Sequence, residues 1–531
     1  MARAQQARSG AAPPYRWWRA ACTPEWRALW RGSLLACALG SACSGQDTVW
    51  LRPDTADASP RAVAPDDGSA AHCGSASESR IVDNSLGKSR AALSVVDRSL
   101  VGAPAAYHAD DTLEARALEL IASQRSRRQV AWQIAERVLT PVPVPAELRS
   151  AGAPASLPAW QTWHAKDDIT RIFRRAYPEL SPAQRSARAP LAESALDAAW
   201  SWNDGAISDF PEWTAERLAA YRDAIGDASQ VSGLAGIYRV AYAPAASRQL
   251  LDSYAEVLRC RERAVAAAPD AAASPVGPAR DVRCGLLPSP PPDCLRAAFP
   301  ASASIIKASW RRSEIDSPLP VYDTSAAGLA RRLAADGKFS WGEPDGQADP
   351  GPDDIYTLRL PNGNAFRLAA LHIMTKELDH WYWLTLWWSP DPNTDFGADR
   401  PSTLPAPFQH YKLCSVVAYN EADPNPTGGF DDLPTLADSL EAAYAGFGGP
   451  TWCSNPYLEE GDGNAGSNCI GCHQHAGTGL RTETVLANPS AFPDHTRKLV
   501  RADFPSDYVF GASVGDDLGA MFQETEQHYT D

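Results

Sequence analysis

Apolar residues at helical spacing dominate the sequence between about residues 106 and 266. Apolar side chains recur every three or four positions over residues 113–121 and again over residues 130–138, which is the pattern of an amphipathic helix. Pro141 lacks a backbone N–H and is expected to end it. The same spacing returns over residues 218–225 and 250–258. Residues 106–266 are therefore predicted to form a mainly α domain.

The pattern changes to short aromatic and β-branched runs after residue 294. Residues 355–360 and 366–375 flank a Pro-Asn-Gly-Asn turn, which predicts a β-hairpin. The run WYWLTLWW at 381–388 is apolar throughout and is typical of a strand buried on both faces. Residues 413–419, LCSVVAY, predict another strand. These runs indicate a β-rich domain over residues 294–425.

The fold class predicted from these patterns is multidomain α+β. Helical spacing returns at residues 435–444, and a last helix is expected after Gly511. Stretches rich in Ala, Pro, Ser, Asp and Gly are typical of linkers. The expected order is a signal peptide at 1–43, a flexible linker at 44–105, the mainly α domain at 106–266, an Ala/Pro-rich linker at 267–293, the β-rich domain at 294–425 and a C-terminal α-helical domain at 426–531.

The N-terminal residues have the layout of an export signal. Basic residues precede the apolar run GSLLACALGSA at 32–42, and Cys43 follows it. The run is shorter than the roughly 20 residues that span a bilayer. A cysteine at this place resembles the lipid-attachment site of bacterial lipoproteins, with Cys37 as a competing site. We therefore expect export to the periplasm or cell envelope, with membrane attachment through a lipid anchor.

Length and charge restrict the function classes. The chain has 531 residues, more than a single ordinary core requires. Its formal net charge is −15 and its pI about 5.2. Because an acidic chain repels phosphate backbones, nucleic acid is not an expected partner.

The chain has eleven cysteines. If the protein is exported, they are expected to form disulfides, because thiols pair in an oxidising compartment. Six cysteines of the mature chain lie outside the motif described next. Among these we expect Cys284 to pair with Cys294 and Cys414 with Cys453, while Cys73 and Cys260 are left unassigned.

Residues 469–473 read C-I-G-C-H, the attachment sequence of a c-type haem. Two thiols three positions apart lie on one helical turn and can each add to a haem vinyl group. The adjacent imidazole is then the proximal iron ligand. Cys469 and Cys472 are thus the predicted haem-binding residues, and His473 the iron ligand.

Two other interpretations of the cysteine pair remain. A zinc site needs two further ligands, and the sequence has no second C-x-x-C or H-x-x-x-H. A redox-active dithiol usually begins a helix in a βαβ unit, and no such pattern precedes Cys469. Haem attachment is the interpretation that the sequence favours.

The C-terminal part resembles a bacterial cytochrome c domain, and the whole chain resembles exported, lipoprotein-like cytochrome c family proteins of unassigned role. The segments carrying the wider resemblance are 452–478 and 371–388. The resemblance implies one covalent haem c, one-electron transfer outside the cytoplasmic membrane and a redox protein partner. The long loop between residues 444 and 469 departs from compact cytochromes c, in which this gap is short.

The second iron ligand is left open by the sequence. Met521 lies 48 residues after His473, a separation like that in His/Met cytochromes, but its helical spacing also suits a core residue. His372 and Met374 share one face of a predicted strand and are alternatives. Another histidine, or an open position, also remains.

Two rival functions follow from these alternatives. An open iron position would suit a haem enzyme or ligand sensor, although an electron carrier is favoured over a catalyst. A surface binding or structural lipoprotein would instead use the β-rich domain.

Acidic residues at 459–462 are expected to be a solvated loop, although they would also suit a basic redox partner. Asp391, Asn393, Asp395 and Asp399 could hold calcium, but Phe396 stands where an EF-hand needs glycine, which favours a solvated turn.

Overall fold

The computed structural model describes part of the chain, all within one compact unit spanning residues 42–531. The first 102 residues lie outside the described part, and with them the predicted signal and all but the last three residues of the first linker. The described residues are 103–144, 155–201, 236–267, 295, 297–313, 318–325, 327–328, 331, 341–359, 365–417, 453–459, 469–473, 476, 505–509 and 518–530.

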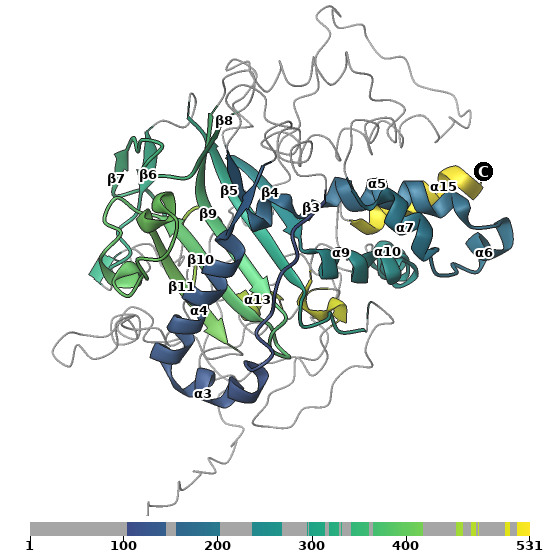
Figure 1. The fold of residues 1–531 in the computed structure, drawn as a ribbon, viewed down its shortest axis with the longest axis horizontal. Helices are drawn as coiled ribbons and strands as arrows, with labels where there is room; N and C mark the ends of the chain where they lie inside the picture. The colour runs from purple at the N-terminus through teal and green to yellow at the C-terminus, as the bar shows by residue number, and fades with distance from the viewer. Residues whose placement is uncertain are drawn as a thin grey trace, which may run out of the picture. The chain divides into compact units, whose positions relative to one another are not determined.

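A seven-stranded antiparallel sheet is the centre of this unit (Figure 1). Its strands follow the order β11-β10-β9-β5-β4-β3, and β8 pairs with β9 beside this path. Two small two-stranded sheets join β1 (Pro141–Pro143) to β2 (Ser156–Pro158) and β6 (Leu319–Val321) to β7 (Gly346–Ala348). The strands of the main sheet are β3 (His164–Ala165), β4 (Gly236–Tyr242), β5 (Ser304–Arg312), β8 (Thr357–Arg359), β9 (Ala365–Thr375), β10 (Tyr382–Trp388) and β11 (Tyr411–Val417).

Helix α4 (Gln124–Leu139) covers one face of the sheet, here called the α4 face. Val130, Ile134 and Val138 of α4 join one apolar cluster with sheet residues such as Leu384 and Leu413. Figure 1 shows α4 lying across β10 and β11. Because side chains alternate along a strand, the intervening residues of β10 face the opposite side.

The opposite face, here called the α13 face, packs against the short helix α13 (Cys469–His473). Trp383 and Trp387 of β10 belong to the same apolar cluster as Cys469 and Ile470. That cluster continues into a group of helices around α5. Besides α3 (Ala117–Ala122), the remaining helices are α5 (Lys166–Ala176), α6 (Pro182–Ser186), α7 (Glu193–Trp200), α9 (Pro244–Asp252), α10 (Tyr254–Ala267) and α15 (Leu518–Thr530).

The structure is a mixed α+β fold, as the sequence predicts. Strands β8 and β9 form the expected antiparallel pair, and every residue of β10 is buried. β11 and the last helix are also present where they are expected. The predicted helices at 218–225 and 435–444 lie outside the described residues.

Residues on both sides of the linker predicted at 267–293 contribute strands to the same sheet. β4 comes from the segment expected to be mainly α, and all seven of its residues pair with β5. The sequence pattern did not reveal β4, because the buried charge of Arg239 interrupts its apolar run. The expected α and β-rich segments therefore share one sheet.

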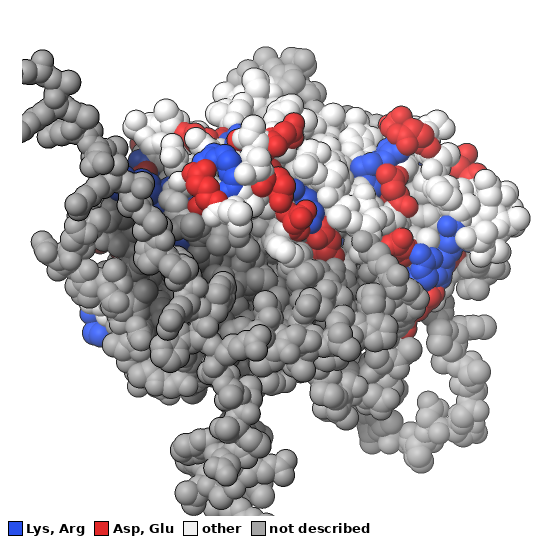
Figure 2. Space-filling model, turned by 90° about the horizontal axis from the view of Figure 1, so that it is seen from below, with Lys and Arg blue, Asp and Glu red and all other residues white. Residues whose placement is uncertain are grey.

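No helix within the described ranges is both long and apolar enough to cross a membrane. Acidic and basic side chains are interspersed on the described surface seen in Figure 2. Among the described residues, Arg188 forms ion pairs with Glu262 and Glu526. The described surface in that view thus carries no single broad acidic patch.

Candidate functional site

The C-I-G-C-H motif forms the single-turn helix α13 on the sheet. Cys469 and Ile470 are buried, whereas Cys472 and His473 are half-buried. Both motif cysteines are thiols in the structure. The i, i+3 spacing places the two sulfur atoms on one side of the turn, with the imidazole beside them. The motif therefore adopts the local conformation that the sequence predicts.

One backbone carbonyl determines which nitrogen of His473 is available to a metal. The Nδ1 atom lies 2.8 Å from the carbonyl oxygen of Tyr508. A carbonyl only accepts, so Nδ1 carries the hydrogen and Nε2 keeps its lone pair. Metal-binding histidines commonly have such a hydrogen bond on their other nitrogen.

The surroundings keep the His473 ring neutral. Burial is the largest cause, and it lowers the pKa of His473 to about 4. The nearby His372 and Lys307 lower this pKa further, while the Tyr508 carbonyl opposes the shift. A neutral imidazole is the form that binds a metal ion.

The ring of His473 rests on the sheet through Trp383. The two ring centroids are 4.7 Å apart, with an interplanar angle of 54°. Trp383 is held in turn, because its Nε1 donates to the carbonyl of His380 at 2.8 Å. The motif histidine is therefore supported by β10 and by the segment around Tyr508.

That segment, Pro505–Tyr508, has a strained backbone. Ser506, Asp507 and Tyr508 have φ angles of 60°, 42° and 69°, in a region that costs non-glycine residues roughly 1–3 kcal/mol each. Such strain persists only where the surroundings enforce it. In this segment, the contacts of Asp507 with neighbouring residues hold the backbone in this conformation.

The Asp507 carboxylate links two neighbouring segments. Its Oδ2 accepts from the backbone N–H of Phe299 at 2.9 Å, and its Oδ1 lies 2.9 Å from Nζ of Lys376. The Asp507 carbonyl also accepts from Nε1 of Trp381 at 3.0 Å. These contacts fix the position of the Tyr508 carbonyl that faces His473.

A row of polar side chains crosses the α13 face beside His473. Strand register places Lys307, His372 and Thr385 opposite one another on β5, β9 and β10. Met374, two residues along β9, lies opposite Trp383. His372 and Met374 therefore both come from the strand next to the one that supports His473.

Glu459 approaches this row from the segment Cys453–Glu459. Its Oε2 is 3.7 Å from Nε2 of His372 and accepts from the backbone N–H of Asn455 at 2.5 Å. The Glu459 side chain is only 18% exposed. The expectation of a solvated acidic loop is thus wrong for Glu459, because the segment folds onto the sheet.

A disulfide and an amide hold that segment in place. Cys414 of β11 is bonded to Cys453, which confirms the pairing expected from the sequence. The Nδ2 of Asn455 donates to Thr385 Oγ1 at 2.7 Å and to the Leu386 carbonyl at 2.9 Å. Cys260 is also disulfide-bonded. Cys73, Cys284 and Cys294 lie outside the described residues.

Met521 lies within the helical group. Its Sδ accepts a hydrogen bond from Thr170 Oγ1 of α5 at 3.0 Å, and the adjacent Phe522 ring is 4.2 Å from the Phe173 ring. The side chain is 3% exposed. These contacts are those of a core methionine and leave its thioether engaged with α5.

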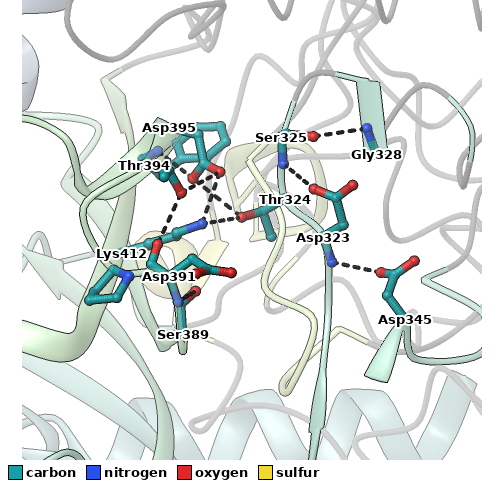
Figure 3. A network of polar contacts seen from close by, with 12 residues as sticks. Asp323, Thr324, Ser325, Gly328, Asp345, Ser389, Asp391, Thr394, Asp395 and Lys412 are labelled. Carbon is teal, nitrogen blue, oxygen red and sulfur yellow. Dashed lines mark hydrogen bonds and ion pairs between the residues drawn. The ribbon is translucent and has the colours of Figure 1, made fainter. Parts of the chain in front are cut away.

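The acidic loop that suggested calcium is engaged by basic side chains. In Figure 3, Nζ of Lys412 lies between Asp395 at 2.9 Å and Thr324 Oγ1 at 3.2 Å. Asp399 pairs with the buried Arg128 at 2.7 Å. Asn393 accepts from Arg400. Asp395 and Asp399 are therefore held by cations in partly buried positions, whereas Asp391 and Asn393 are exposed, as expected for a solvated turn.

The residues around α13 fit covalent haem attachment. Two thiols share one turn, the histidine tautomer has its hydrogen on Nδ1 and its lone pair on Nε2, and the ring is neutral. Among the described residues, no group of three or more His, Cys, Asp or Glu is placed to hold a metal ion. The haem interpretation needs only His473 and a second ligand, so it does not depend on such a group.

No protein-family model, curated protein or solved structure matches this chain.

Proposed function

We propose that this protein is an exported c-type cytochrome that carries one covalent haem and transfers single electrons outside the cytoplasmic membrane. The observation that carries the proposal is the α13 turn, in which the Cys469 and Cys472 thiols lie beside an imidazole whose Nδ1 is bound to the Tyr508 carbonyl. In this proposal residues 426–531 form the haem-binding, cytochrome c-like part of the α+β fold.

The chain's own residues have distinct tasks in this function. Cys469 and Cys472 would hold the cofactor by thioethers, and His473 would provide a nitrogen ligand to the iron. The bound group supplies the reversible one-electron change of its iron. Trp383 and the Tyr508 carbonyl orient the imidazole, and the apolar residues of the α13 face, such as Trp383 and Ile470, would restrict water around the bound group, which affects the reduction potential.

Export and lipid anchoring belong to the same proposal. Support comes from the N-terminal signal pattern and Cys43 or Cys37, and from the disulfide between Cys414 and Cys453. Disulfides persist in oxidising compartments, where haem thioethers are also formed. A redox protein is the expected partner, in the periplasm or cell envelope.

The test is a pyridine haemochrome spectrum of the full chain produced with a haem-attachment system. The wild type should show a c-type α-band at one haem per chain, and Cys469→Ser/Cys472→Ser should lose it. The matched control is Cys260→Ser, which removes a described cysteine outside the motif and should retain the band. A wild-type chain without covalent haem would refute the proposal and favour a disulfide-stabilised surface lipoprotein.

A further inference from the structure

The second iron ligand can be sought among side chains on the α13 face. His473 contacts Trp383 of β10, with ring centroids 4.7 Å apart. The neighbouring strand β9 places Met374 opposite Trp383 and His372 opposite Thr385. Both side chains share the face of the sheet that carries α13. The two candidates for the second iron ligand on β9 are therefore the thioether of Met374 and the imidazole of His372.

Of the two candidate side chains, His372 is the one with a polar atom, Nε2, that lacks a hydrogen-bond partner in the described part of the chain. Its Nε2 is shielded from solvent and has no hydrogen-bond partner among the described residues. Native proteins rarely leave such an atom unsatisfied, and a missing ion or ligand is one explanation. The Met374 side chain does not require a hydrogen-bond partner, because it lies in the apolar cluster between Ile305 and Trp383.

Glu459 approaches His372 without satisfying this nitrogen. The separation of 3.7 Å between Oε2 and Nε2 is longer than a hydrogen bond. The same oxygen already accepts from the backbone N–H of Asn455 at 2.5 Å. The Asn455 amide and the disulfide of Cys453 attach this segment to the sheet. The carboxylate is thus held beside His372 while Nε2 remains available.

We propose that His372 is the second protein ligand of the haem iron, so that two histidines from distant parts of the chain would hold it. The proposal rests on the function inferred above. It excludes Met521, whose sulfur accepts from Thr170 inside the helical group. Since a methionine ligand raises the reduction potential, a two-histidine centre is expected to have a lower potential than a His/Met centre.

The experiment uses the full-length, haem-loaded protein and its ferric and ferrous spectra. The wild type should be low-spin and should lack the sulfur-to-iron charge-transfer band of methionine ligation. His372→Ala should become high-spin in the ferric state and should bind CO in the ferrous state. Added imidazole should restore the low-spin spectrum. Met374→Leu and Met521→Leu are matched controls that should retain the wild-type spectrum.

His372→Met provides a second test that keeps a ligand on β9. It should gain the sulfur-to-iron band and a higher potential. If His372→Ala does not accumulate, this variant and low-temperature electron paramagnetic resonance of the wild type still separate two-histidine from His/Met ligation.

Haem content, measured on every variant, separates the two proposals. Covalent haem with a methionine band in the wild type, a low-spin His372→Ala, or a haem-loaded His372→Met without the band would overturn the ligand assignment alone. Absence of covalent haem from the wild type would overturn the cytochrome proposal and this inference together.

Discussion

The contacts of individual residues explain which parts of the candidate site could be predicted from the sequence. Cys469, Cys472 and His473 were predictable because thioether attachment requires this spacing of side chains. Tyr508 left no such signal, since it contributes a backbone carbonyl that every residue possesses. His372 was recognisable as a candidate on a predicted strand. Its unsatisfied Nε2 and the proximity of Glu459 depend on segments that are far apart along the chain, which periodicity does not connect.

His380 should make stability depend on pH. Burial, followed by the charge of Lys376, lowers the pKa of His380 below its ordinary value. The unfolded chain therefore binds a proton at a higher pH than the folded chain does. Stability should be retained near pH 7 and lost as the pH falls below about 6.5, by at most about 1.4 kcal/mol per pH unit from this group.

His380→Gln is the variant that isolates this effect, because glutamine does not titrate. Urea unfolding at pH 7 and pH 5.5 should show a smaller pH-dependent loss in the variant than in the wild type. His528→Gln is the matched control, on the exposed last turn of α15. Equal losses in wild type and His380→Gln would show that His380 does not carry the effect.

At the scale of elements, strands with unbroken apolar runs were predictable and interrupted ones were not. β10 is buried at every residue and has the sequence YWLTLWW, so its pattern and its environment agree. β4 combines Arg239 with apolar neighbours, and a buried cation obscures the strand pattern. The segment Cys453–Glu459 has no regular periodicity. Its position depends on a disulfide and on the Asn455 amide.

The Cys414–Cys453 bond should contribute strongly to the stability of this arrangement. It joins residues 39 positions apart, and closing a loop of that length removes about 4 kcal/mol of unfolded-chain entropy in the loop model. Cys414→Ala/Cys453→Ala should lower the free energy of unfolding by roughly 2–4 kcal/mol, measured by urea denaturation. The double variant should still bind haem, because Cys469 and Cys472 are unchanged. An unchanged urea midpoint would contradict the predicted contribution.

At the scale of the whole molecule, the sheet connects parts that composition alone suggested were separate. The Ala/Pro-rich stretch at 267–293 resembles a domain linker. Yet β4 and β5, on either side of it, pair along seven residues of β4. The last helix α15 also packs on α5 and α10 from the predicted α segment. Local composition identifies a linker, but it does not show whether the segments it joins share a core.

This connectivity predicts that residues 106–266 do not fold alone. Without β5, β4 loses its pairing along one edge and Tyr242 loses its neighbour Ile305. Without α15, Phe173 loses the ring of Phe522, 4.2 Å away. The isolated fragment should lack a cooperative thermal transition and dispersed amide resonances, whereas residues 103–531 should retain both. A fragment 106–266 that unfolds cooperatively would establish an independent α domain and would contradict the shared sheet as the basis of its stability.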